Sequence, residues 1–167
     1  MGVLKHESQE YTRGSKALKV FIRKFPRGKS LKAKDISYTS VLKDKLLVAR
    51  AVKEGVTNAL FEEIKGNSPF TEAQWASFLD VNIRTLQRYK GDASHIYKPL
   101  QSERIFELAE VISRGNAVFD ASEHLDLWLN SPCLALGGEK PIELLDSSYG
   151  KDLILAELNR IEYGIFV

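Results

Sequence analysis

The side chains that could carry out catalysis are few and lie far apart in this 167-residue chain. The histidines, His6, His95 and His124, have no metal-ligand spacing. The single cysteine, Cys133, has no obvious general base, and no Gly-x-Ser-x-Gly motif occurs. We therefore expect neither an enzyme nor a metal or cofactor site.

Side chains able to read DNA gather in one short predicted helix, which runs from Asn82 to Lys90. If its apolar side chains point inward, the opposite face presents the polar set Arg84, Thr85, Gln87 and Arg88, followed by Lys90. Arginine can bind guanine and glutamine can bind adenine through paired hydrogen bonds, and lysine suits a phosphate. An ordinary helical hairpin with a solvated face is the alternative.

A second short helix, predicted over 72–79, must position that face. Thr71 and Gln74 form a capping box at its start, and Asn82 is a good N-cap for the helix that follows. The three-residue connection matches a helix-turn-helix. Asp80 occupies the turn position that needs a left-handed conformation, where glycine is usual.

Helical spacing of apolar residues continues through most of the remaining chain, and no strand pattern follows residue 40. Asp120 and Glu123 form a further cap pair, and Trp128 is expected in the core. The expected helices cover 46–54, 57–65, 102–116, 121–129, 142–145 and 148–162. Residues 130–141 contain turn-forming Pro and Gly and form a loop. The predicted fold class is all-α.

The charge is unevenly distributed. Residues 1–45 hold 12 Lys or Arg against 4 Asp or Glu, whereas the rest of the chain is net acidic. A basic segment over 1–43 is typical of an arm that faces a polyanion, and a solvated leader is the alternative. The apolar run Leu18–Phe25 alternates roughly like a strand, so a short strand or an unstructured arm is expected.

The last eight residues combine polar and large apolar side chains. Ile165, Phe166 and Val167 would leave costly apolar surface in water unless this protein's own core or a partner covers them. A lone cysteine fits a reducing compartment. No segment approaches the ~20 apolar residues of a membrane span, and the chain start lacks a secretion signal. A cytoplasmic protein is expected.

From Phe70 to Val167 the chain resembles the Xre/MbcA/ParS antitoxin family. The resemblance is carried, in order, by Leu86-Gln87-Arg88-Tyr89, Gln101-Ser102-Glu103-Arg104, Ala117-Val118-Phe119, Trp128-Leu129-Asn130-Ser131-Pro132, Leu134-Ala135-Leu136-Gly137-Gly138, Pro141-Ile142-Glu143-Leu144-Leu145 and Arg160-Ile161-Glu162-Tyr163-Gly164. It implies an Xre-like helix-turn-helix domain, residues 44–100, and a small helical toxin-binding domain, residues 101–167.

The resemblance also implies partners. Such antitoxins bind RES-domain toxins that consume NAD, cover the toxin's NAD pocket, repress their operon through operator DNA, and tend to form homodimers. The expected toxin-binding residues are Arg160, Glu162, Tyr163, Gly164, Ile165, Phe166 and Val167. Aromatic and aliphatic side chains would fill an apolar cleft, charged groups would give direction, and glycine would let the backbone turn.

Two other classes compete with this interpretation. One is a stand-alone transcription regulator whose C-terminal helices sense a ligand or form a dimer. The other is an interaction module whose helix-turn-helix no longer binds DNA. A neighbouring gene for a RES-domain protein favours the antitoxin over the stand-alone regulator.

Overall fold

The computed structural model describes residues 15–164, and this part of the chain is helical with one isolated antiparallel bridge, Thr57 to Ile96. The all-α prediction is confirmed. The helices are α2 (Lys16–Ile22), α3 (Pro26–Ser30), η1 (Ala33–Asp35), α4 (Tyr38–Lys43), α5 (Lys45–Glu54), α6 (Asn58–Gly66), α7 (Glu72–Phe78), α8 (Ile83–Lys90), α9 (Pro99–Val118), α10 (Ser122–Leu129), η2 (Leu134–Leu136), α11 (Pro141–Leu144) and α12 (Ser148–Glu162).

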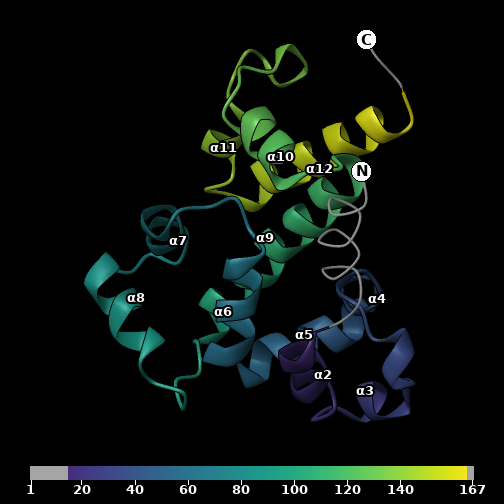
Figure 1. Cartoon of the computed structure of the whole chain (residues 1–167), viewed down its shortest axis with the longest axis vertical. Helices are drawn as coiled ribbons and strands as arrows, with labels where there is room; N and C mark the ends of the chain where they lie inside the picture. The colour runs from purple at the N-terminus through teal and green to yellow at the C-terminus, as the bar shows by residue number, and fades with distance from the viewer. Residues whose placement is uncertain (1–14, 165–167) are drawn as a thin grey trace.

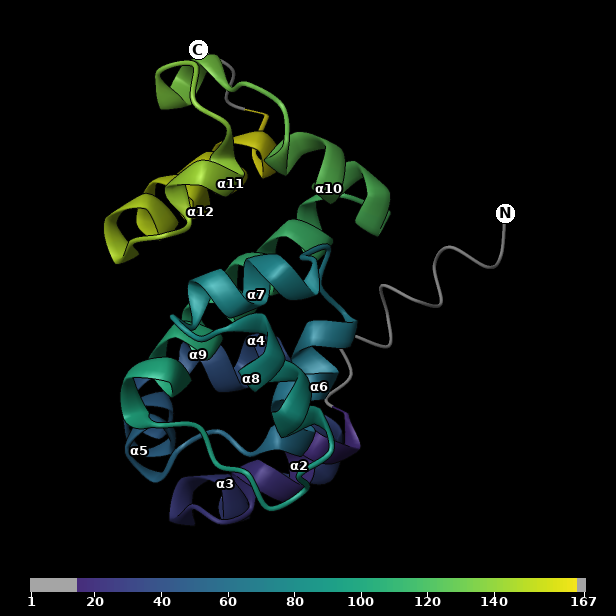
Figure 2. The same cartoon turned by 90° about the vertical axis from the view of Figure 1, so that its left-hand side faces the viewer.

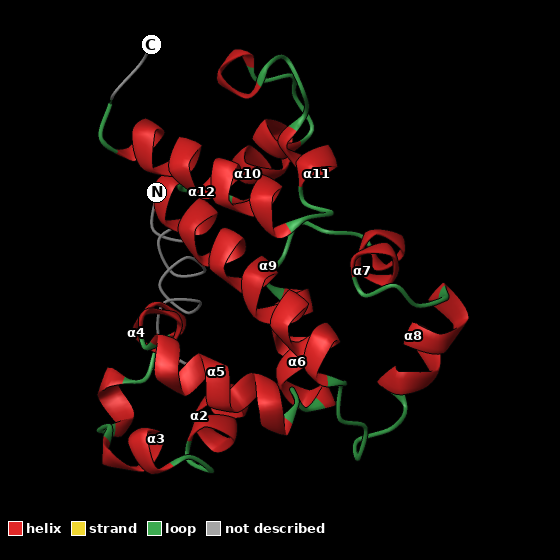
Figure 3. Cartoon of the chain, turned by 180° about the vertical axis from the view of Figure 1, so that it is seen from behind, coloured by secondary structure: helices red, strands yellow, loops and turns green. Residues whose placement is uncertain are grey.

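The longest helix, α9, runs through the middle of the molecule (Figure 1). It packs against α4, α5, α10 and α12. Ile105, Leu108, Ala109 and Ile112 are fully buried along it. At one end of α9 lie α10, α11 and α12, and at the other lie α2 to α5, with α7 and α8 on a flank (Figures 1 and 3). One helix therefore connects all parts of the fold.

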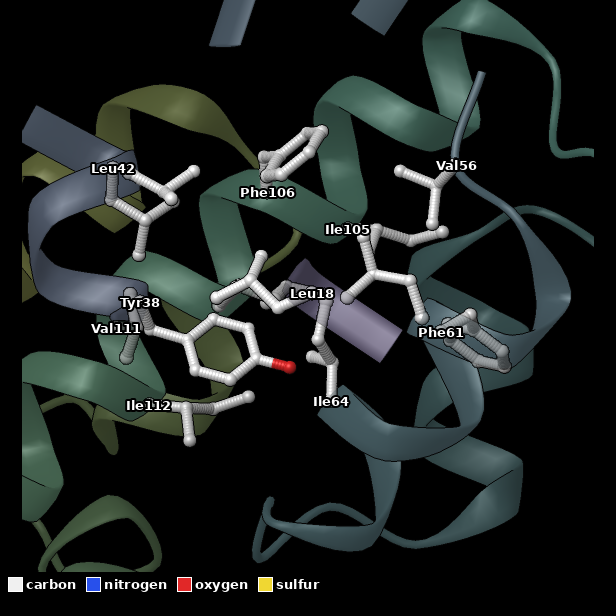
Figure 4. Close-up of a cluster of buried hydrophobic side chains, with 14 of the residues drawn as sticks. Leu18, Tyr38, Leu42, Val56, Phe61, Ile64, Ile105, Phe106, Val111 and Ile112 are labelled. Carbon is white, nitrogen blue, oxygen red and sulfur yellow. The ribbon is translucent and has the colours of Figure 1, made fainter. Parts of the chain in front are cut away.

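The main core forms where side chains from segments far apart in the sequence meet α9 (Figure 4). Leu18 of α2 and Ile64 of α6 are fully buried there, and Tyr38 of α4 is 2% exposed. Phe61 of α6 packs edge-on against Trp75, with ring centroids 5.2 Å apart. Burial of large apolar side chains is the main favourable term in folding.

Residues 15–43 belong to this core, so the expectation of a strand or an unstructured arm is wrong for them. Leu18, Phe21, Ile22 and Phe25 are all at most 4% exposed, and they recur at helical spacing. Val20, which an alternating strand would have placed on the same side as Leu18, is 60% exposed. The buried side chains therefore follow the 3.6-residue period of a helix and not the two-residue period of a strand. Residues 1–14 of the predicted arm lie outside the described residues.

Polar contacts attach this N-terminal part to the rest. Glu63 of α6 accepts hydrogen bonds from the Tyr38 hydroxyl at 2.6 Å and from the Ala17 backbone amide at 3.3 Å. Gly28 approaches the Ile22 carbonyl so closely that a Cβ would lie 2.0 Å from its oxygen. These contacts form only when α2, α3, α4 and α6 pack together in this arrangement.

Helix α9 begins at Pro99, three residues before its predicted start. The buried hydroxyl of Ser102 accepts from the Val56 amide at 2.8 Å and donates to the Tyr97 carbonyl at 3.1 Å. It thereby joins the segment after α5 to the segment before α9. The predicted domain boundary between residues 100 and 101 falls in the first turn of α9, and the division into domains stays a prediction.

Two smaller predictions on α10 need correction. Its N-cap is Ala121, with no side-chain hydrogen bond, so the cap pair of Asp120 and Glu123 is absent. Trp128 is only half-buried and packs against Phe119, with centroids 5.8 Å apart. Leu125 and Leu129 fill the interior instead, because they point toward α9 while Trp128 covers the edge of the helix.

The burial of α2 gives a stability prediction. Phe21→Ala removes a ring that is 1% exposed and packs 6.4 Å from Phe106, so we expect a loss of about 3–5 kcal/mol in the free energy of unfolding. Lys16→Ala, at an exposed site on the same helix, is the control and should change it by less than about 0.5 kcal/mol. Chemical denaturation followed by circular dichroism measures both, and equal stabilities would show that α2 is not core.

Candidate functional site

The α7–α8 hairpin has the local structure that the sequence predicts. The Thr71 hydroxyl accepts from the Gln74 amide at 3.2 Å, and the Gln74 side chain accepts from the Thr71 amide at 2.8 Å. Trp75 is fully buried, and its indole N–H donates to the Ser68 hydroxyl at 2.9 Å. The predicted capping box is therefore confirmed, and Trp75 attaches the start of α7 to the core.

The turn between the two helices has the predicted backbone. Asp80 has φ of 51°, in the left-handed region. The Val81 amide donates to the Ala76 carbonyl at 3.0 Å, which closes the end of α7. The side chain of Asn82 accepts from the Arg84 amide at 2.9 Å and caps α8. This geometry sets α8 across α7 as in a helix-turn-helix.

The outward face of α8 carries the predicted polar set. Leu86 is 1% exposed and points into the core, so the face opposite to it meets solvent. Thr85 is half-buried, at the edge of this face. The exposed members are Arg84, Gln87, Arg88 and Lys90. The predicted orientation is confirmed, and contact with DNA stays a prediction.

One acidic side chain borders this face. The Glu72 carboxylate accepts from the Gln87 amide at 3.3 Å and pairs with the Lys65 ammonium at 3.4 Å. The Gln87 hydrogen bond, followed by the Lys65 charge, holds the pKa of the Glu72 carboxyl below its usual value. Gln87 is thus oriented by an ionised group, and its second amide N–H and its carbonyl oxygen are left for a base edge.

Aromatic packing supports the end of α8. Tyr89 stacks on His95 with centroids 3.5 Å apart, and His95 meets Tyr97 edge-on at 4.7 Å. Burial lowers the pKa of His95, although the Asp92 carboxylate opposes that shift. The Arg88 guanidinium lies 5.9 Å from the Tyr89 ring centroid. His95 therefore packs against both Tyr89 and Tyr97. This aromatic packing supports α8 near Arg88.

The predicted C-terminal site is partly engaged in contacts within the chain. Arg114 of α9 donates to Asn159 at 2.6 Å and pairs with Glu162, while Arg160 pairs with Glu157 at 2.5 Å. Arg160 and Glu162 are therefore not free charges. Both pairs are partly exposed, and such pairs contribute little and exchange easily.

Beyond these pairs the chain turns outward. Tyr163 is 73% exposed, and Gly164 has φ of 65° with open space where a Cβ would lie. Ile165, Phe166 and Val167, and with them the question of what covers Phe166, lie outside the described residues. The last described aromatic residue is thus available to a partner. The end of α12 and helix α8 lie on opposite sides of the molecule (Figure 1).

Sequence reasoning missed other exposed apolar residues of the C-terminal part. Leu134, in the loop before α11, is 94% exposed, and Tyr149 of α12 is 87% exposed. The hairpin-like loop is held by the Cys133 amide donating to the Glu139 carbonyl at 3.0 Å. A helical projection of 148–162 could have found Tyr149, whereas nothing local marks Leu134 as exposed.

Within residues 15–164, no group of three or more His, Cys, Asp or Glu is placed to hold a metal ion. His124 is exposed on α10, and His6 lies outside the described residues. In the same part of the chain, no helix has the length and apolar character needed to cross a membrane.

The fold and the α8 face define an all-α helix-turn-helix protein with an appended helical unit. Comparison with known families agrees with this. Residues 47–110 match the antitoxin Xre-like helix-turn-helix domain, and residues 114–164 match the antitoxin Xre/MbcA/ParS C-terminal toxin-binding domain. Together these matches cover more than half of the chain. The protein belongs to the Xre/MbcA/ParS antitoxin family, as the resemblance of its motifs implied.

Individual proteins show the same relationship. The chain is 33% identical over 105 residues to the Prs ADP-ribosylating antitoxin of Sphingobium sp. (strain YBL2), an alignment that covers 56% of this chain and 65% of that protein. It therefore spans less than two thirds of that relative. Its fold is similar to a chain of the crystallised M. tuberculosis MbcT–MbcA toxin–antitoxin complex, with a TM-score of 0.52, 22% identity, and coverage of 66% of this chain and 99% of that one.

The turn between α7 and α8 gives a prediction of backbone strain. Asp80→Gly removes the Cβ at a positive φ, so it should leave the melting temperature unchanged or raise it. Asp80→Val puts a β-branched residue there and should cost at least about 1 kcal/mol. Thermal unfolding checks both, and a Val variant as stable as the Gly variant would contradict the strain.

Proposed function

We propose that this protein is an antitoxin that binds and blocks a RES-domain, NAD-consuming toxin through the region from about Asn130 to Val167. The observation that carries the proposal is the exposed end of α12: Tyr163 is 73% exposed at the end of the segment that matches a toxin-binding domain. The relative's name supports the kind of toxin, because ADP-ribosylation consumes NAD.

The chemistry of the segment suits occlusion of a pocket. Tyr163 leads into three large apolar residues, a composition that fits a cleft shaped for a ring system. Arg114 of α9 contacts Asn159 and Glu162, and these contacts link the last turn of α12 to α9.

Removal of the tail tests this function. Deletion of residues 163–167 should abolish toxin neutralisation and weaken binding to the RES-domain protein encoded by the adjacent gene at least 100-fold. Buried residues of α12 such as Leu158 remain in place, so the fold should persist. Growth rescue in cells that express the toxin and calorimetric titration with the purified toxin measure the two effects.

The control is Glu123→Ala, which changes an exposed side chain of α10 outside the region from Asn130 to Val167. It should neutralise the toxin like the unmodified protein. Unfolding of the truncated protein, seen by circular dichroism, would mean that the tail is core. Full neutralisation by the truncated protein would place the inhibitory contact elsewhere.

We further propose that α8 reads operator DNA, through which the protein represses its own operon as a dimer in the cytoplasm. Arg84, Gln87 and Arg88 are exposed on α8, which supports base contacts by a helix placed in the major groove. The exposed Lys90 supports a phosphate contact. The basic side chains of residues 15–43 add positive charge to the same chain. Two-fold symmetry would match a palindromic operator.

Substitution on α8 separates the two activities. Arg84→Ala with Arg88→Ala should weaken operator binding at least about 10-fold, because a good bidentate base contact is worth about 1–3 kcal/mol. Toxin binding should not change, since α8 and the end of α12 lie on opposite sides of the molecule (Figure 1). Electrophoretic shift and fluorescence anisotropy with the upstream DNA measure operator affinity.

Lys53→Ala, an exposed lysine of α5, is the matched control and should have little effect. Absence of any shift at low salt, where phosphate contacts are strongest, would eliminate the repressor role. Equal loss of DNA and toxin binding would show that α8 supports the fold instead. A protein that binds the operator but no RES toxin would be the stand-alone regulator.

A further inference from the structure

A hollow of about 360 Å³ lies where α4, the start of α5 and α12 meet on α9. One wall belongs to α9, whose Glu110, Ser113, Arg114 and Ala117 recur at steps of three, one and three residues and so share one face. Figure 2 shows α12 near the top of the molecule and α5 nearer the bottom, and both pack on α9. The hollow, which we call the α4–α9–α12 hollow, therefore joins segments that are far apart in the sequence.

Most of this lining lies outside the surfaces proposed above for DNA and toxin. The α4 residues Thr39, Leu42 and Lys43 precede both segments that match the antitoxin domains, and Ser113 lies between those segments. From α12 the hollow takes Leu155 and the Asn159 side chain, which accepts from Arg114 of α9. These two α12 residues thus lie on the side of that helix that meets α9.

The lining carries a surplus of positive charge. Its cations are Lys43, Lys45 and Arg114, and its single carboxylate is Glu110. That carboxylate is shared already, because it pairs with the Lys45 ammonium at 3.0 Å and with the Lys151 ammonium at 3.8 Å. Lys43 is exposed and makes no ion pair with any described residue. A cleft lined mainly by charges of one sign attracts ligands of the opposite sign, so the hollow suits an anion.

Hydrogen-bond donors also border the hollow. Ser113 is 8% exposed, and its hydroxyl has one contact in the described part of the chain, 3.4 Å to the Thr39 hydroxyl. Only one of two paired hydroxyls donates to the other, so one proton is left for a further acceptor. The Arg114 guanidinium donates from Nε to Asn159 and pairs through Nη2 with Glu162. Its Nη1 adds donors that suit a carboxylate or phosphate oxygen.

The rest of the lining is apolar. Leu42 is 7% exposed, Leu155 is half-buried and Ala117 is exposed beside them. Figure 4 shows Leu42 at the edge of the main core, which holds it in place. Pockets for small molecules combine apolar walls with a few polar groups and have volumes of about 300–1,000 Å³. The hollow is at the lower end of that range, so it fits one small molecule with an apolar part.

We propose that the α4–α9–α12 hollow binds a small organic anion. A carboxylate or phosphate of the ligand contacts Lys43 and the hydroxyls of Thr39 and Ser113, and an apolar or ring-shaped body packs on Leu42 and Leu155. The proposal needs only the packing of α4 and α12 on α9, so it does not rest on the proposed function. A bound ligand contacts both of these helices and therefore stabilises the folded protein.

Calorimetric titration of the full chain with three probes of similar size tests the proposal. The probes are 1-naphthylacetate, 1-naphthyl phosphate and the neutral 1-naphthylacetamide. The better of the two anions should bind about 10-fold or more tightly than the amide, because charge-assisted hydrogen bonds are about twice as strong as neutral ones. The order of the two anions identifies the head group. Absence of binding by both anions at millimolar concentration, or an amide that binds equally well, would overturn the proposal.

A charge substitution locates the site. Lys43→Gln should weaken binding of the preferred anion about 3- to 10-fold and leave the amide unaffected, since it removes a charged donor from an exposed position. Lys29→Gln, which changes an exposed lysine of α3 outside the lining, is the matched control and should leave both affinities unchanged. Both side chains are exposed, so neither change should lower the melting temperature.

A second substitution fills the hollow. Ala117→Leu enlarges an exposed side chain of the lining and should weaken binding of the anion about 10-fold or more, with circular dichroism as the check on folding. In two-dimensional NMR of the unmodified chain, the anion should shift the backbone amide signals of Thr39 and Ser113. If Ala117→Leu unfolds the protein, Lys43→Gln and this NMR map decide.

An anion whose affinity is the same in every folded variant, or which shifts signals elsewhere, would bind at another place, and the proposal would fail. None of these measurements uses toxin or DNA, so their outcome is independent of the proposed function.

Discussion

The structure depends on the burial of α9 from several sides. Ile105, Leu108, Val111 and Ile112 are fully buried on this one helix, although they do not share a single narrow stripe. A helix that is apolar around most of its circumference is stable in water only if other elements surround it. The helices before α6, the hairpin and the C-terminal helices therefore pack around α9. The position of each depends on its packing in this shared core.

This dependence also sets where the two candidate surfaces lie. The hairpin packs on α6 through Trp75 and Phe61, and its Leu79 carbonyl accepts from the Gln101 side chain of α9 at 3.4 Å. Helix α12 packs on α9 and buries Ile154 and Leu158. Helix α8 and the end of α12 lie on opposite sides of the molecule (Figure 1). The proposed DNA contact and the proposed toxin contact at the end of α12 would therefore form at separate places.

Local signals made the hairpin and much of the helical layout predictable. The capping box at Thr71, the cap at Asn82 and the left-handed turn at Asp80 each involve residues within a few positions of one another. Such interactions depend on nearby side chains and hardly on the rest of the fold. The outward direction of Arg84 and Arg88 followed from the same local geometry, since Leu86 had to be buried.

The sequence by itself determined the helical class, the boundaries near strong caps and the polar face of α8, because those depend on short-range spacing and hydrogen bonding. Tertiary structure decided that Leu18, Phe21 and Ile22 lie on a helix in the core, that Arg114 pairs with Glu162 across 48 positions, and that Tyr149 and Leu153 of α12 stay exposed. A run such as Leu18–Phe25 fits a strand or a helix equally well on its own. Which apolar face is buried depends on the surfaces that distant segments bring to it, and only the folded chain supplies those surfaces.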